Sequence, residues 1–145
     1  MSRDLRSEAG NALVEFVYLA VLLMVPLVYV LISVFFVQRA AFGTTEAARQ
    51  AGRAYARAAT VDEAERRATA AARLVLADQG LVLGPSDLTF TCRGGPCLSG
   101  GSRVQITVKH PVRLPILGAV FGASDRGAIP VSATHTEYVD RYKAP

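Results

Sequence analysis

The sequence has few of the side chains from which catalytic and metal-binding sites are built. It contains only two histidines and two cysteines, and neither His110 nor His135 lies at a zinc-like spacing from Cys92 or Cys97. Each histidine falls in a strand pattern with no obvious serine, cysteine or carboxylate partner near it in sequence, so we interpret both as ordinary strand residues. No nucleophile motif and no phosphate-cradling glycine loop is present. We therefore expect no catalytic residue, no metal and no cofactor, and no enzyme activity.

Charge is absent from residues 16–37. At the rise of about 1.5 Å per residue in an α-helix, this segment reaches about 33 Å, which is enough to cross a hydrocarbon core of roughly 30 Å. Glycine is absent from residues 12–42, so a GxxxG seam is missing and lateral contacts must be aliphatic and aromatic. Pro26 stands in mid-span, where it removes one backbone hydrogen bond and predicts a modest bend. The segment predicts a single transmembrane helix surrounded by membrane lipid.

The formal net charge of +4 does not indicate a nucleic-acid partner. The excess positive charge comes from arginines scattered along alanine-rich helical segments, without the aromatic platforms on which single-strand binders stack bases. Arg49, Arg53 and Arg57 follow one another at steps of four, and we interpret this row as a solvated helix face.

An alanine-rich pattern continues the helix beyond the membrane segment. Small or aromatic residues recur at steps of three and four, which predicts one helix of roughly forty-five residues from about Asn11. The recurring positions are Ala47, Ala48, Ala51, Tyr55 and Ala58. Gly43 and Gly52 lie within this pattern and weaken it.

A second helix is predicted from Thr60 to Asp78. Thr60 and Glu63 match a capping box, in which a hydroxyl and a carboxylate each satisfy a free backbone amide, and Gly80 is placed to end the helix. One face of this helix carries small or aliphatic residues, namely Ala64, Ala68, Ala71, Ala72, Val75 and Leu76.

After Gly80 the pattern changes from helical to alternating, which predicts strands at residues 87–92, 103–109 and 128–139. In the third strand one side is formed by Val131, Ala133, His135 and Glu137. Residues 111–127 are expected to form a longer crossing. The sequence therefore predicts an α+β protein in which the second half of the long helix and the second helix cover one face of a small antiparallel sheet.

Cys92 and Cys97 flank a turn-rich connection between the first two strands. A disulfide that closes this short loop would steady a hairpin, and we favour it over a two-thiol metal site. A disulfide is typical of an oxidising compartment, so it places the C-terminal domain outside the cytoplasmic membrane. The arginines give no such direction, because they both precede and follow the apolar segment.

Glu15 is the one ionisable residue near the start of the apolar segment, and burying it costs free energy unless a cation pairs with it. It lies five residues after Gly10, and Arg3 and Arg6 precede that glycine. Because the small residue comes before the apolar run, cleavage by a Sec-type signal peptidase is not expected. Two interpretations of Glu15 remain open: it reaches the membrane surface at the helix end, or it pairs with another subunit.

The residues Gly10-Asn11-Ala12-Leu13-Val14-Glu15-Phe16, followed by an apolar helix, resemble the class III leader of type IVb prepilins. The alanine- and arginine-rich helix and the later segment PVRLPILGAVFG resemble the TadE-like minor pseudopilins of the Tad (tight adherence) secretion system. Major Flp pilins usually have tyrosine at the position of Phe16 and a much shorter mature chain. Phe16 and the C-terminal domain therefore favour the pseudopilin branch, and the resemblance implies a pilin-like fold.

The resemblance implies that a prepilin peptidase cuts after Gly10 on the cytoplasmic face and that the subunit then joins other pilin or pseudopilin subunits and the Tad machinery. Cleavage would create an ammonium group at Asn11, which a staggered neighbouring subunit could bring close to Glu15. The implied organisation is a leader at residues 1–10, a transmembrane helix at 11–43, a helical part at 44–80 and a β part at 81–145.

Two classes of function fit these observations. The first is a structural subunit of a pilus-like machine, processed at Gly10 and assembled through Glu15 and Phe16. The second is a single-span, membrane-anchored binding or sensor protein whose extracytoplasmic domain engages a ligand or the cell wall. A third, an anchored accessory enzyme, is disfavoured because no catalytic constellation is present.

Overall fold

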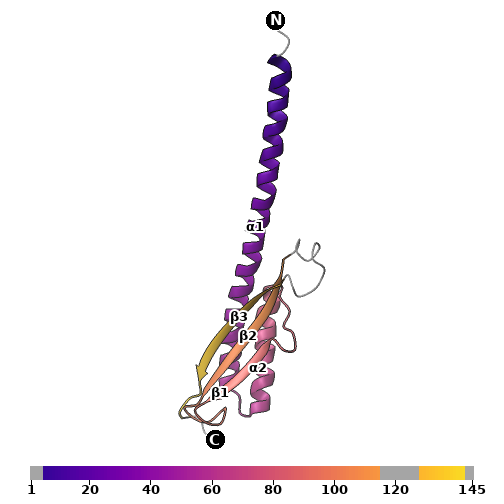
Figure 1. Ribbon diagram of the computed structural model, residues 1–145. Coiled ribbons are helices and arrows are strands. Elements are labelled where there is room, and N and C mark those ends of the chain that lie inside the picture. Colours follow the sequence, from indigo (N-terminus) through magenta and orange to yellow (C-terminus); the bar gives the residue numbers. More distant parts are fainter. Residues whose placement is uncertain (1–4, 115–127, 143–145) are drawn as a thin grey trace. The chain divides into compact units, whose positions relative to one another are not determined.

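A computed structural model describes residues 5–114 and 128–142, with the backbone alone described for residues 5–11. The chain forms helix α1 (Leu5–Ala56), helix α2 (Val61–Asp78) and strands β1 (Leu88–Arg93), β2 (Arg103–Arg113) and β3 (Ala128–Tyr138), as Figure 1 shows. This order of two helices followed by an antiparallel sheet confirms the predicted α+β class. The chain divides into two compact units, Met1–Phe35 and Phe36–Pro145.

Helix α1 is longer than the sequence predicts. It begins at Leu5, before the expected start near Asn11, and ends at Ala56. No proline interrupts residues 5–10, so these residues can continue the helical hydrogen bonding toward the N-terminus. The helix also continues through Pro26.

The N-terminus of α2 is capped largely as predicted. The Thr60 side chain accepts a hydrogen bond from the Glu63 amide at 3.3 Å. The Glu63 carboxylate accepts one from the Ala59 amide at 3.0 Å, one residue before the amide that a strict capping box would use. Glu63 also pairs with Arg67, one turn further along, at 2.6 Å.

The C-terminus of α2 ends in a Schellman motif. The amide of Gly80 donates to the carbonyl of Ala77 at 2.8 Å, and the amide of Leu81 donates to the carbonyl of Leu76 at 2.8 Å. Gly80 has a positive φ of 65°, which a glycine adopts without steric cost. The prediction that Gly80 ends this helix is confirmed.

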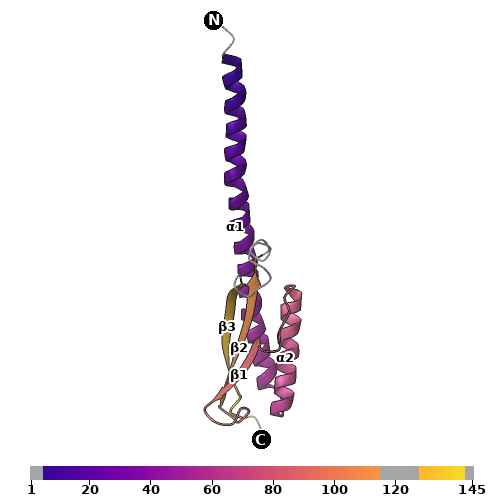
Figure 2. The same cartoon turned by 45° about the vertical axis from the view of Figure 1, so that its right-hand side comes forward.

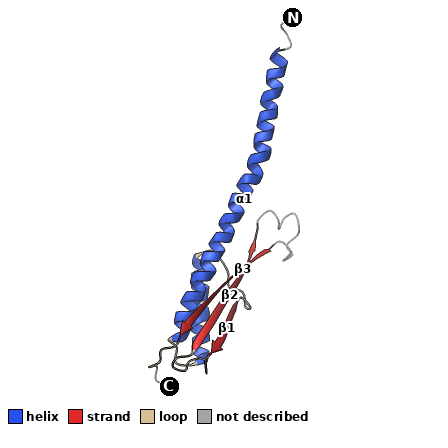
Figure 3. Cartoon of the chain, turned by 60° about the vertical axis from the view of Figure 1, so that its left-hand side comes forward, coloured by secondary structure: helices blue, strands red, loops and turns tan. Residues whose placement is uncertain are grey.

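The sheet has the strand order β1-β2-β3, and both pairings are antiparallel. Figure 3 shows the three strands in red. Strand β2 extends to Arg113, beyond the predicted end at residue 109, and Pro111 lies opposite Pro130 of β3. β1 pairs with β2 only as far as Val108, so Pro111 lies where β2 has a single paired neighbour. Proline is tolerated there because one edge of β2 needs no hydrogen-bond donor.

The core of the second unit lies between one face of the sheet and the two helices, which are on the same side of the sheet in Figure 2. The sheet contributes Val104, Ile106 and Val108, all fully buried. The helices contribute mainly alanines, whose small side chains let the backbones approach closely: Ala47, Ala48, Ala51, Ala64, Ala68 and Ala72, with Tyr55 and Leu76. The predicted buried faces of both helices are confirmed, and the predicted row Arg49, Arg53 and Arg57 is exposed.

Gly52 is a close contact between α1 and the sheet. A Cβ atom at this position would lie 3.1 Å from Cδ2 of His135, 3.3 Å from Cβ of Glu137 and 3.4 Å from Cδ1 of Ile106. The glycine that weakened the sequence-based helix assignment is therefore a contact residue of the core.

Candidate functional site

The N-terminal part of α1 presents an apolar surface with nothing packed against it. Its side chains from Ala12 to Val28 are all exposed. The helix from Ala12 to Ala56 is long and apolar enough to cross a membrane, and its most apolar part is not buried. It is the one such helix among the described residues, and it is consistent with a single-pass membrane protein.

Glu15 lies on this apolar surface. It is exposed, and within the described part of the chain its carboxylate has no hydrogen-bond or ion-pair partner. The backbone at Gly10 and Asn11 is helical, so Asn11 lies one turn before Glu15 on the same helix face. The predicted processing residues and the predicted assembly carboxylate are thus neighbours on one short stretch of helix.

A shallow apolar hollow lies on the same part of α1. It has a volume of about 460 Å³ and contains no charged residue in its lining, which consists of Phe16, Leu19, Ala20, Leu22, Leu23 and Pro26. Phe16, the aromatic residue of the leader motif, is 70% exposed at one end of it.

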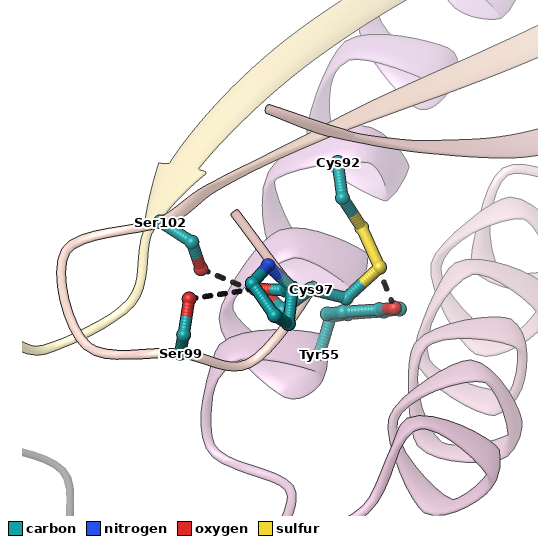
Figure 4. The surroundings of a disulfide bond; sticks show 6 residues. Tyr55, Cys92, Cys97, Ser99 and Ser102 are labelled. Atoms are coloured by element: carbon teal, nitrogen blue, oxygen red, sulfur yellow. Dashed lines mark hydrogen bonds between the residues drawn. A yellow bond between two sulfur atoms is a disulfide. The ribbon is translucent and has the colours of Figure 1, made fainter. Parts of the chain in front are cut away.

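The second unit contains the predicted disulfide between Cys92 and Cys97, whose Cα atoms are 5.1 Å apart. Figure 4 shows it beside the C-terminal end of α1. The Tyr55 hydroxyl lies 3.9 Å from Cys92 Sγ, and the Ser102 hydroxyl donates to the Cys97 carbonyl at 3.2 Å. The disulfide therefore closes the β1–β2 loop against the wall of the core, which is a structural role.

Burial raises the pKa of the Tyr55 hydroxyl, and the nearby charge of Glu65 adds to this effect. The Tyr55 ring also packs against Phe90, with ring centroids 5.2 Å apart. Tyr55 is therefore a neutral core residue at ordinary pH.

One sequence-based prediction about the histidines is wrong. His135 was expected to have no carboxylate partner, but its Nε2 lies 3.0 Å from Oε2 of Glu137. Residues two apart on a strand point to the same face, so the spacing of His135 and Glu137 was the signal that could have found this pair. The pair lies against Gly52 of α1.

A second feature that the sequence did not reveal is a pocket of about 430 Å³ within the second unit. It joins α1, the loop between α2 and β1, and β2, and its charged or titratable lining residues are Arg39, Asp87, His110 and Arg113. His110 has a buried Nδ1 atom without a hydrogen-bond partner. These residues are far apart in sequence, so no local pattern predicts the pocket. The one hint in the sequence is Arg39, which is the first cation after the apolar segment.

Among residues 5–114 and 128–142, no three histidine, cysteine or acidic side chains are grouped in a way that could hold a metal ion. Comparison with protein families, curated proteins and solved structures finds no match to this chain. Its function must therefore be argued from the helix, the carboxylate and the pocket.

Proposed function

We propose that the protein is a structural subunit of a Tad-type pilus assembly or secretion machine, a TadE-like minor pseudopilin with a pilin-like fold. In this proposal a prepilin peptidase removes residues 1–10 and the subunit assembles through its N-terminal helix. The observation that supports it most is the Glu15 carboxylate, which has no partner among the described side chains, on an otherwise apolar exposed helix five residues after Gly10.

The energetics favour assembly as the role of Glu15. A carboxylate costs several kcal/mol in a low-dielectric environment when it is alone, and much less when a cation is paired with it. Cleavage after Gly10 would provide that cation as the new ammonium group of Asn11. Within one chain this ammonium lies one turn from Glu15. In a staggered assembly it can pair with the Glu15 of a neighbouring subunit instead. This pairing would stabilise one axial offset between the subunits over others.

The proposed topology places the N-terminus in the cytoplasm and the second unit outside the membrane. The Cys92–Cys97 disulfide supports this direction, because disulfides persist in oxidising compartments. The partners in this proposal are the membrane, the prepilin peptidase and other pilin or pseudopilin subunits, with no nucleic acid.

The test is a Glu15→Gln variant, with Glu46→Gln as the control. Glu46 lies further along the same helix, is exposed and accepts a hydrogen bond from Gln50 one turn away. Glu15→Gln should insert in the membrane and fold normally, because removal of a charge lowers the insertion cost. It should fail to co-purify with the other subunits, since loss of one partner of a buried pair costs about 3–5 kcal/mol.

Mass spectrometry of the mature N-terminus completes this test. The proposal requires a mature chain that begins at Asn11. A Glu15→Gln protein that assembles as well as the parent would mean that Glu15 only reaches the membrane surface at the helix end.

The alternative function is a single-span anchored protein that binds a ligand outside the cytoplasm. The pocket around Arg39 and His110 is the observation that favours it. An intact N-terminus beginning before Gly10 would support this alternative and contradict the pseudopilin proposal.

A further inference from the structure

The pocket that contains Arg39 lies next to the predicted membrane surface. Two of its lining residues, Phe36 and Arg39, belong to the helical turn at which the uncharged segment 16–37 ends. A bilayer that covers this segment has its lipid headgroups at the level of that turn. All lining residues of the pocket belong to the second unit.

The lining combines apolar walls with a guanidinium group. Phe36, Leu81, Val82 and Val112 provide apolar surface, and Arg39 provides the guanidinium, whereas Arg113 already interacts within the chain. The one carboxylate in the lining is that of Asp87, whose Oδ2 accepts a hydrogen bond from the Gly84 amide at 2.8 Å. This composition fits a ligand that has an anionic group next to apolar chains.

Arg39 is placed in this pocket without a partner. Its Nη2 lies close to the backbone of Gly80. A Cβ atom at residue 80 would be only 2.8 Å from this nitrogen, so a larger side chain there would collide with it. The nearby C-terminal carbonyls of α2 already accept the Schellman hydrogen bonds from Gly80 and Leu81. Within the described part of the chain Arg39 has neither an ion pair nor a hydrogen bond. Capping of α2 therefore does not account for this guanidinium.

Val82 adds exposed apolar surface at the edge of the pocket. It lies in the loop after α2, lines the pocket and is 79% exposed. A valine side chain this exposed at the rim of a basic pocket is unfavourable in water, and it gains free energy when acyl chains or the apolar part of a headgroup cover it.

We propose that this pocket binds the phosphate group of an anionic membrane phospholipid. Arg39 donates hydrogen bonds to the phosphate oxygens, as guanidinium groups do at phosphate sites. Phe36 and Val82 contact the glycerol backbone and the first carbons of the acyl chains. The site would fix the depth and rotation of the second unit at the bilayer surface. It requires the membrane helix but not cleavage at Gly10 or assembly through Glu15.

The test measures lipid that stays bound to the purified full-length chain. The protein is extracted in detergent, incubated with equal amounts of phosphatidylglycerol and phosphatidylcholine, and examined by native mass spectrometry. The parent should retain phosphatidylglycerol selectively. Arg39→Gln should reduce the retained phosphatidylglycerol about fivefold, the effect expected for one basic residue at an anionic surface. Arg49→Gln removes an exposed arginine from the same helix outside the pocket and should change nothing.

Two further variants separate loss of binding from loss of folding. Val82→Asp changes an exposed residue, so the domain should keep its thermal unfolding midpoint while phosphatidylglycerol retention falls. Arg39→Lys keeps the charge and should retain most of the selectivity. Equal losses in Arg39→Gln and Arg49→Gln would overturn the proposal, because they would indicate a diffuse electrostatic effect.

A parallel measurement with inorganic phosphate distinguishes the source of the phosphate group. The lipid assignment predicts weak binding of inorganic phosphate and no displacement of bound phosphatidylglycerol. Binding of inorganic phosphate that depends on Arg39, without selective retention of phosphatidylglycerol, would overturn it in favour of a soluble phosphate ligand.

Discussion

At the scale of single residues, Glu63 has the most clearly perturbed carboxylate in the described chain. The hydrogen bond from the Ala59 amide is the largest cause that lowers its pKa below the usual value of 4.5, and the charge of Arg67 lowers it further. A carboxylate whose pKa is lowered in the folded state stabilises the fold above its unfolded pKa. This contribution is lost as the pH falls through the lower, folded pKa.

We therefore expect Glu63→Gln to change the acid sensitivity of the protein. In the parent, the thermal unfolding midpoint of the second unit should fall as the pH decreases below about 4.5. In Glu63→Gln it should be lower at neutral pH and should depend less on pH in this range. Glu65→Gln, two residues along the same helix, is the control. Parallel pH profiles for the parent and Glu63→Gln would contradict the assigned role.

Contacts between single residues can be predicted from the sequence when the partners are close together in the chain. The cap formed by Thr60 and Glu63 and the helix end at Gly80 could be predicted because all partners lie within a few residues. The disulfide between Cys92 and Cys97 was favoured for the same reason. The pocket around Arg39 joins segments some seventy residues apart in the printed sequence, and no local pattern specifies that approach.

At the scale of elements, the contact between α1 and its neighbours depends on two glycines that differ in what surrounds them. At Gly52 the neighbours are the His135 ring, Cβ of Glu137 and the end of Ile106, all held in the sheet. At Gly43 the nearest atoms are Cδ1 of Leu81 at 3.2 Å and Cγ of Gln79 at 3.3 Å, which belong to flexible side chains. The same substitution should therefore have opposite effects at the two positions.

Gly52→Ala should destabilise the second unit and Gly43→Ala should not. Alanine gains about 1 kcal/mol over glycine in a helix interior, whereas overpacking of a rigid core costs about 1–3 kcal/mol. At Gly43 the flexible neighbours can move, so we expect a stabilisation of up to about 1 kcal/mol. At Gly52 we expect a net loss of up to about 2 kcal/mol. Thermal or denaturant unfolding of both variants, monitored by tyrosine circular dichroism, would measure these changes in stability. A stabilised Gly52→Ala would contradict the prediction, because it would mean that the sheet moves to make room for the methyl group.

Strand lengths were less predictable than strand positions. The alternation of apolar and polar residues located all three strands, but Pro111 was interpreted as the end of the second one. Pairing with β3 carries β2 on to Arg113, since Pro111 faces Pro130 and neither residue has to donate. β2 can continue past Pro111 because β1 does not pair with it there, so one edge of β2 needs no hydrogen-bond donor.

At the scale of the whole molecule, α1 serves both units without a break between them. It contributes the apolar surface around Glu15 and, further along, the buried residues Ala47, Ala51 and Tyr55. The fold of the second unit therefore requires part of the helix that is also the candidate membrane span of the described chain.

A soluble fragment should accordingly fold only if it keeps the second half of α1. A fragment that begins at Gln38 retains the complete buried helix face and should unfold cooperatively. A fragment that begins at Ala59 lacks Tyr55 and the buried alanines. Loss of one buried aromatic side chain alone costs about 3–5 kcal/mol, a large part of the 5–15 kcal/mol that stabilises a typical domain. Cooperative unfolding of the shorter fragment would show that the sheet and α2 are self-sufficient.

The continuity of α1 also has a mechanical consequence. In the proposed membrane topology, a flexible linker after the apolar segment would let tension enter the second unit at one point and unfold it residue by residue. Because the same helix continues into the core, tension along its axis acts on all of the contacts between Ala47 and Tyr55 at once, in shear. Such a pull is shared by the whole contact between the helix and the sheet, which includes the close approach at Gly52.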